Sequence, residues 1–126
     1  MPAKLILIIE DDLRIAALVA EVLREAGYEV HLVPDLGAAR TFAQEGGHPT
    51  AIISDLVVAG AAEPAQVSAE IETAFPGVPL ALMTGVPPNR RAQLGVTHDL
   101  VLEKPFELGA LLGTVVAMAG PAEETP

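Results

Sequence analysis

The chain has 126 residues, 51% of them hydrophobic and 19% charged, which is the composition of a single globular domain. It has no cysteine, and this excludes thiol catalysis, disulfide scaffolds and cysteine-based zinc sites. Seven basic against 17 acidic residues give a formal net charge of −10, so we expect no direct binding to nucleic acid and none to an anionic membrane. No apolar run approaches the roughly 18 to 20 residues of a membrane span, and we find no signal peptide, so we expect a cytoplasmic protein.

Short apolar runs alternate with longer segments of helical spacing along the chain. This alternation predicts βα units around a parallel sheet. The runs are almost uninterrupted, which is typical of strands that helices cover on both faces. We therefore predict an α/β fold with a five-stranded parallel sheet in a three-layer sandwich, its strands at Leu5–Ile9, Val30–Val33, Ala51–Ile53, Leu80–Met83 and Leu100–Leu102.

The helices are predicted from apolar spacing and from end signals. The first has its apolar face between Ile15 and Ala26, with Asp12 as the N-cap and Gly27 as the stop. The connection 85–98 contains two adjacent prolines, so we expect it to be irregular, with only a short helix. Residues 1–120 would form the domain and 121–126 a flexible acidic tail. The remaining predicted helices are Asp35–Gln44, Pro64–Phe75, Asn89–Leu94 and Leu108–Met118.

Polar residues follow four of the five predicted strands. In an open parallel sheet, ligands bind beyond the carboxyl ends of the strands, so these residues are the candidates for a site. If the first and third strands are neighbours, carboxylates, a hydroxyl and an ammonium meet at one edge. The segments concerned are Glu10-Asp11-Asp12, Ser54-Asp55, Thr84-Gly85 and Glu103-Lys104-Pro105.

Glu10, Asp11 and Asp55 would repel one another at that edge unless a positive charge neutralised them. Oxygen ligands without histidine or cysteine indicate magnesium or manganese. A carboxylate nucleophile, a hydrated metal, a lysine and a hydroxyl together make the parts that phosphoryl transfer needs. The residues at this edge therefore supply the parts for phosphoryl chemistry.

Four segments of the chain resemble the receiver domain of two-component response regulators. They occur in the order and at nearly the spacing of that family, and the resemblance covers about residues 4 to 118. Each motif alone is weak, but together they are highly specific. The segments are Leu5 to Asp12, Ile52 to Gly60, Leu82 to Gly85 and Leu102 to Phe106.

The resemblance implies a flavodoxin-like (βα)5 fold with strand order 2-1-3-4-5. It further implies that Asp55 is the phosphoacceptor and that magnesium is held by Glu10, Asp11, Asp55 and the carbonyl of Val57. Lys104 would pair with the phosphoryl group, and Thr84 would hydrogen-bond one of its oxygens. The Lys104–Pro105 peptide bond is expected to be cis.

The chain departs from the family pattern at three places, one of which is a slightly short interval between Thr84 and Lys104. Val58-Ala59-Gly60 stands where receivers usually carry Met-Pro-Gly, so only the glycine is kept. Val101 stands where the family has its switch aromatic, so the usual coupling between a threonine and an aromatic side chain cannot operate. The surface that signals the phosphorylated state is therefore not predicted.

The resemblance implies a phosphoprotein of a phosphorelay, with a histidine kinase or histidine phosphotransfer protein as donor and a downstream protein as target. Self-phosphorylation and slow self-dephosphorylation are the only catalysis expected, in a monomer or weak dimer. Met1 and the short tail favour a stand-alone receiver. One alternative is a receiver-like binding module that phosphorylation does not control. Another is an enzyme on a similar sheet, although the acidic loop after the first strand argues against flavin binding.

Several other polar residues are interpreted as structural. Ser54 lacks a nucleophile elbow, and no histidine is placed to activate it. Asp12 is expected to cap its helix and to add charge behind the metal. His31, His48 and His98 lie on separate segments and are expected at the surface or at strand edges. Arg90-Arg91 is interpreted as a solvated pair.

Overall fold

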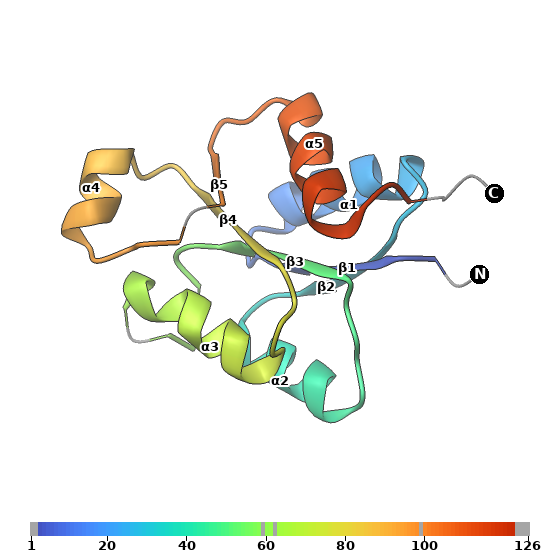
Figure 1. The fold of residues 1–126 in the computed structure, drawn as a ribbon, viewed down its shortest axis with the longest axis horizontal. Helices are drawn as coiled ribbons and strands as arrows, with labels where there is room; N and C mark the ends of the chain where they lie inside the picture. The colour runs from blue at the N-terminus through green and yellow to red at the C-terminus, as the bar shows by residue number, and fades with distance from the viewer. Residues whose placement is uncertain (1–2, 59, 62, 99, 123–126) are drawn as a thin grey trace.

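The chain folds around one parallel sheet whose strand order is β2-β1-β3-β4-β5 (Figure 1). The computed structural model describes residues 3–58, 60–61, 63–98 and 100–122. The predicted fold class and strand order are confirmed. The Lys104–Pro105 peptide bond is cis, as the resemblance implied. The strands are β1 (Leu5–Ile9), β2 (Glu29–Val33), β3 (Ala51–Asp55), β4 (Leu80–Thr84) and β5 (Val101–Glu103).

Helices cover both faces of the sheet and make the three layers that the sequence predicted (Figure 1). Helices α1 (Leu13–Glu25) and α5 (Leu108–Ala119) pack on one face, and α2 (Leu36–Gln44) and α3 (Val67–Ala74) pack on the other. A 3₁₀ turn at Pro64–Gln66 precedes α3. The short α4 (Pro88–Gln93) lies at the opposite end of the view from the chain termini.

The core sits in two layers because successive strand side chains point to opposite faces. Leu7 and Ile52 contribute to the layer under α2 and α3, whereas Ile8 and Ile53 contribute to the layer under α1 and α5. All four side chains are fully buried. Burial of one such side chain stabilises the fold by about 1.5 to 3 kcal/mol, so β1 and β3 are anchored from both sides.

Two aspartates fix the starts of helices. Asp12 Oδ1 accepts hydrogen bonds from the backbone N–H groups of Arg14 and Ile15, at 3.0 and 3.4 Å. Asp35 Oδ1 accepts one from Ala38 at 2.8 Å. Each bond satisfies a helix N–H that has no partner within the helix. The predicted cap at Asp12 is confirmed, and it fixes the direction in which the chain leaves β1.

The prediction that all five strands are covered on both faces is wrong for β2. Glu29, His31 and Leu32 are exposed there, because β2 is an edge strand with a neighbour on one side only. The ring of His31 stacks on Phe42, with ring centroids 4.3 Å apart. In the fifth strand, the predicted first residue Leu100 precedes β5 and is partly exposed.

Two side chains bond the C-terminal end of α5 to the sheet. They do so at the amino ends of the strands, opposite the carboxyl ends. Lys4, just before β1, donates from Nζ to the carbonyl of Ala119 at 2.9 Å. The Tyr28 hydroxyl, just before β2, donates to the carbonyl of Gly120 at 2.7 Å. The predicted tail at 121–126 falls mostly on residues 123–126, which lie outside the described residues. Among the described residues, no helix combines the length and the apolar character that crossing a bilayer requires.

Candidate phosphoacceptor site

The sheet register brings the predicted site residues to one edge. Ile9 pairs with Ser54, Asp55 with Met83, and Thr84 with Glu103, so β1, β3, β4 and β5 end nearly level. Backbone hydrogen bonds continue past the strands. Glu10 N–H donates to the carbonyl of Val33 at 3.0 Å, and Lys104 N–H donates to that of Thr84 at 2.7 Å.

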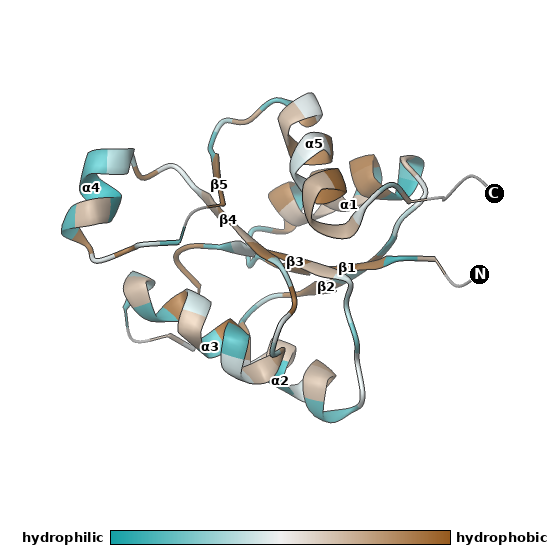
Figure 2. Ribbon diagram, in the orientation of Figure 1, coloured by the Kyte–Doolittle hydropathy of each residue, from teal (hydrophilic) through white to brown (hydrophobic). Residues whose placement is uncertain are grey.

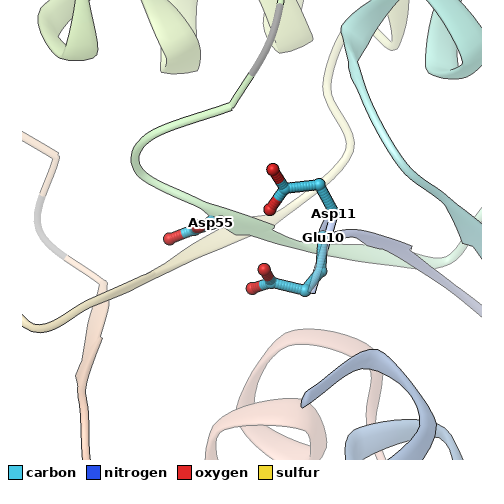
Figure 3. A group of neighbouring side chains, drawn as sticks. All are labelled: Glu10, Asp11 and Asp55. Atoms are coloured by element: carbon cyan, nitrogen blue, oxygen red, sulfur yellow. The ribbon is translucent and has the colours of Figure 1, made fainter. Parts of the chain in front are cut away.

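Three carboxylates meet at this edge (Figure 3). One oxygen from each of Glu10, Asp11 and Asp55 lies within 4.8 Å of the other two. Glu10 is only 3% exposed, Asp55 is half-buried, and Asp11 is exposed. Adjacent residues at the end of β1 thus offer one carboxylate from within the fold and one from the solvent side.

Lys104 supplies the positive charge of the cluster. Its Nζ lies 3.3 Å from Glu10 Oε2 and 3.4 Å from Asp55 Oδ1. One ammonium therefore contacts carboxylates from two different strands. We call Glu10, Asp11, Asp55 and Lys104 the acidic edge, because three negative groups there face one positive group.

Burial shifts the proton affinity of the two inner carboxylates. Burial raises the pKa of Glu10 above its usual value, while the Asp12 N–H and Lys104 oppose the rise. Burial likewise raises the pKa of Asp55, against opposing effects of Lys104 and the Val57 N–H. The negative form is thus costly on both groups, and one lysine does not offset that cost.

The donor set of the acidic edge fits a hard divalent cation. All three ligand groups are carboxylates, the oxygen donors that magnesium prefers. The unbalanced negative charge favours a further cation beside Lys104. Glu10, Asp11 and Asp55 are also the group that could hold a metal among the described residues, and no histidine belongs to it.

Thr84 and Val57 lie next to the acidic edge. Thr84 is buried at the end of β4, and its Oγ1 accepts a hydrogen bond from the Val86 N–H at 2.9 Å. Val57 is exposed two residues after Asp55. Ser54 is fully buried, and its hydroxyl donates to the carbonyl of Asp55 at 2.9 Å, which fits the structural role predicted for it.

The histidines lie outside the cluster. His31 and His48 are exposed, as predicted. The His98 Nε2 lies 2.6 Å from the carbonyl of Leu80, at the start of β4 and therefore at the other end of that strand from Thr84.

The prediction of a solvated Arg90-Arg91 pair holds for Arg90 and is wrong for Arg91. The Arg91 side chain is only 14% exposed and forms an ion pair with Glu103, at 3.2 Å. Arg91 Nη1 also donates to the carbonyl of Val86 at 2.7 Å. The two partners lie twelve positions apart in the sequence, and no local sequence pattern connects them, so sequence analysis missed the pair.

A curated relative matches most of this chain. In Mycobacterium tuberculosis, the transcriptional regulatory protein TcrA is 31% identical over 125 residues, which cover 96% of this chain and 49% of TcrA. The chain thus spans about half the length of the curated relatives it matches. No family model matches the sequence.

Solved structures agree on the fold. A response regulator receiver protein from Sinorhizobium medicae superimposes with a TM-score of 0.78 at 23% identity, over 96% of this chain and 98% of that one. The chemotaxis protein CheY4 of Vibrio cholerae gives 0.76 at 26% identity, over 93% and 99%. The resemblance to response regulator receiver domains, expected from four short motifs, is confirmed.

Proposed function

Because this chain has the fold of response regulator receiver domains and carries their motif residues at one edge of the sheet, we propose that it is the phosphoacceptor of a two-component phosphorelay. Asp55 takes a phosphoryl group from a phosphohistidine on a histidine kinase or a histidine phosphotransfer protein. The modified protein then changes its contacts with a downstream protein. The observation that carries this proposal is the Lys104 ammonium lying 3.4 Å from Asp55 Oδ1 and 3.3 Å from Glu10 Oε2.

The reaction assigned to Asp55 is an in-line displacement at phosphorus. A carboxylate oxygen of Asp55 attacks, a P–O bond forms, and the P–N bond of the donor breaks with its electron pair returning to the imidazole. The product is an acyl phosphate that carries two negative charges next to Glu10. Lys104 already contacts both side chains, so it neutralises part of that charge.

Glu10, Asp11 and Asp55 are the residues that would hold magnesium, and the carbonyl of Val57 completes the proposed set. When bound, the ion supplies positive charge to the phosphoryl oxygens. The chain's own contribution is to place the ligands. Asp12 helps here, because its N–H donates to Glu10 Oε1 at 3.1 Å and its side chain caps α1.

Thr84 is proposed to hydrogen-bond a phosphoryl oxygen. Its hydroxyl now accepts from Val86, so its proton is available to an acceptor on the other side.

The protein acts in the cytoplasm as a monomer or weak dimer and catalyses only its own phosphorylation and slow dephosphorylation. Residues 1–120 make the domain, and 121–126 follow it as a tail.

A second candidate function is a receiver-like binding module that phosphorylation does not control. The observation in its favour is Val101, which lies in β5 where the family carries its switch aromatic. A chain that lacks the aromatic can keep the fold and use it only for protein contacts.

Incubation with magnesium and acetyl phosphate separates the two functions. We expect intact-mass spectrometry to show one added phosphoryl group, and we expect Asp55→Asn to remove it. Asp35→Asn is the matched control, because it makes the same chemical change at a helix cap away from the acidic edge and asparagine also caps helices well. Absence of any adduct on the wild type would support the binding module, and an adduct on Asp55→Asn would identify a different acceptor.

A further inference from the structure

Helix α4 lies at the surface of the molecule. None of its residues is buried, and Figure 2 shows hydrophilic residues on it while the strands are hydrophobic. A six-residue helix without a buried face gains little from packing and is marginal by itself. Its position must therefore depend on specific polar contacts and on the chain segments that flank it.

Arg91 provides the side-chain contacts that join α4 to the sheet. Its Nη1 and Nη2 each lie 3.2 Å from Glu103 Oε1, at the last residue of β5. Its Nη1 also donates to the carbonyl of Val86, in the segment between β4 and α4. Its neighbour Arg90 is exposed and contacts only Gln93 among the hydrogen bonds described for it, so the two arginines differ in place and not in chemistry.

The same contacts lead directly to the acidic edge. Glu103 immediately precedes Lys104, whose backbone N–H bonds Thr84 and whose Nζ bonds Asp55. Val86 is held from two sides, by Thr84 Oγ1 on its N–H and by Arg91 on its carbonyl. The two groups proposed to contact the phosphoryl group, Thr84 and Lys104, are therefore each one step from the Arg91 contacts.

We propose that the Arg91–Glu103 ion pair positions α4 and couples it to the acidic edge, in the part of the fold where Val101 leaves no aromatic switch. The coupling rests on the proposed phosphorylation of Asp55. A phosphoryl group that attracts Thr84 and Lys104 pulls on Val86 through one and on Glu103 through the other. Both partners of Arg91 then shift, and the contacts that attach α4 to the sheet change with them.

The Arg91–Glu103 ion pair is a weak interaction, which a change elsewhere in the protein can reverse. The Glu103 side chain is 55% exposed, so water screens the attraction. Pairs of this kind shift an equilibrium by about two- to five-fold, which is enough to bias α4 and little enough for a change at Asp55 to reverse it. Arg91 and Glu103 are positioning residues, since neither is assigned a contact with the phosphoryl group.

Hydrogen–deuterium exchange of the amides that end α4 tests the ion pair in the unmodified protein. The N–H groups of Leu94, Gly95 and Val96 bond carbonyls within α4, so they report its opening. We expect Glu103→Gln to speed their exchange about two- to five-fold. Arg90→Gln, which removes one positive charge from the exposed neighbour of Arg91, should leave their exchange unchanged. Equal rates in both variants would overturn the proposal.

A double-variant cycle distinguishes the pair from two separate effects. Arg91→Gln removes the contacts to both Glu103 and Val86, so its exchange should be the faster of the two single variants. The double variant Arg91→Gln/Glu103→Gln should exchange no faster than Arg91→Gln alone, because the pair is already broken. Additive acceleration would show that Arg91 and Glu103 act independently and would contradict the proposal.

The coupling is measured on the same samples after treatment with magnesium and acetyl phosphate. We expect phosphorylation to change exchange at residues 94–96 in the wild type and to change it less than half as much in Glu103→Gln. Intact mass is recorded in parallel, so a wild type without an adduct refutes the proposed function and the coupling together, while the rates in unmodified protein still decide whether the pair positions α4. An adduct that changes α4 equally in both proteins refutes the coupling alone.

Discussion

The two sides of the candidate site are built differently. On the β1–β3 side, Glu10 and Asp55 extend from strands whose side chains are buried in two core layers. On the β4–β5 side, β5 has three residues and α4 has none that is buried. Glu10 and Asp55 thus follow strands that the core anchors, whereas Lys104 follows the short β5 and Thr84, although buried, leads into the segment that ends in the exposed α4. Polar contacts therefore contribute more to the position of α4 than to that of β1 and β3.

Deletion of a core side chain gives the largest expected contrast. Ile53→Ala removes a fully buried side chain from β3 and should lower the free energy of unfolding by about 2 to 5 kcal/mol. Val96→Ala, in the half-buried segment after α4, should cost about 1 kcal/mol. Urea unfolding of both variants measures the difference. Similar losses would mean that the two sides are equally well packed.

Magnesium affinity tests the fixed side. Asp11→Asn keeps the size of an exposed side chain and removes one of three carboxylates, so we expect magnesium to bind at least about tenfold more weakly, or about 1.4 kcal/mol. Isothermal titration with magnesium chloride measures the affinity, with Asp35→Asn as the control. Unchanged magnesium affinity in Asp11→Asn would show that the ion binds outside the acidic edge.

Stability without metal should depend on pH through Asp55. Because burial raises the pKa of Asp55 in the folded chain, the folded state holds the proton more tightly than the unfolded state does. This contribution is therefore fully present below the unfolded pKa, near 3.8, and is lost as the pH rises through the folded value. Asp55→Asn cannot ionise, so in chelator it should gain stability over the wild type on going from acid to neutral pH, by less than the loss at Ile53. If the difference in free energy of unfolding between the two proteins stayed constant across that pH range, the raised pKa of Asp55 would be contradicted.

Glycine substitution in two helices gives the smallest contrast. Ala17→Gly at an exposed position inside α1 should lower the free energy of unfolding by about 1 kcal/mol. Ala92→Gly, exposed in α4, should change it by only a few tenths, because α4 can open while the rest of the protein stays folded. Thermal or urea unfolding compares the two. An equal loss at Ala92 would show that α4 unfolds together with the core.

The acidic edge was predictable because it depends on topology alone. Once Leu5–Ile9 and Ala51–Ile53 are taken as neighbouring parallel strands, their carboxyl ends meet and bring Glu10, Asp11 and Asp55 together. In β2 the exposure of His31 was expected, whereas that of Leu32 was not, because Leu32 stands between apolar neighbours in the pattern of a covered strand. Position in the sheet, and not local sequence, decides exposure there.

The Arg91–Glu103 ion pair was beyond sequence analysis for another reason. It depends on where a connection with two prolines returns to the sheet, and neither partner lies in a periodic pattern that fixes its direction. Twenty-four charged residues in the chain allow many pairings of similar strength. Only the three-dimensional path of α4 selects this one.

The bonds from Lys4 and Tyr28 to the end of α5 determine where an attachment would leave the molecule free. Both bonds lie at the amino ends of the strands, a full strand length away from Asp55. A fluorophore, bead or fusion partner tethered just beyond Gly120 would therefore leave the acidic edge exposed. That geometry suits immobilised assays, in which the protein is held by its far side while phosphoryl transfer is followed at the other.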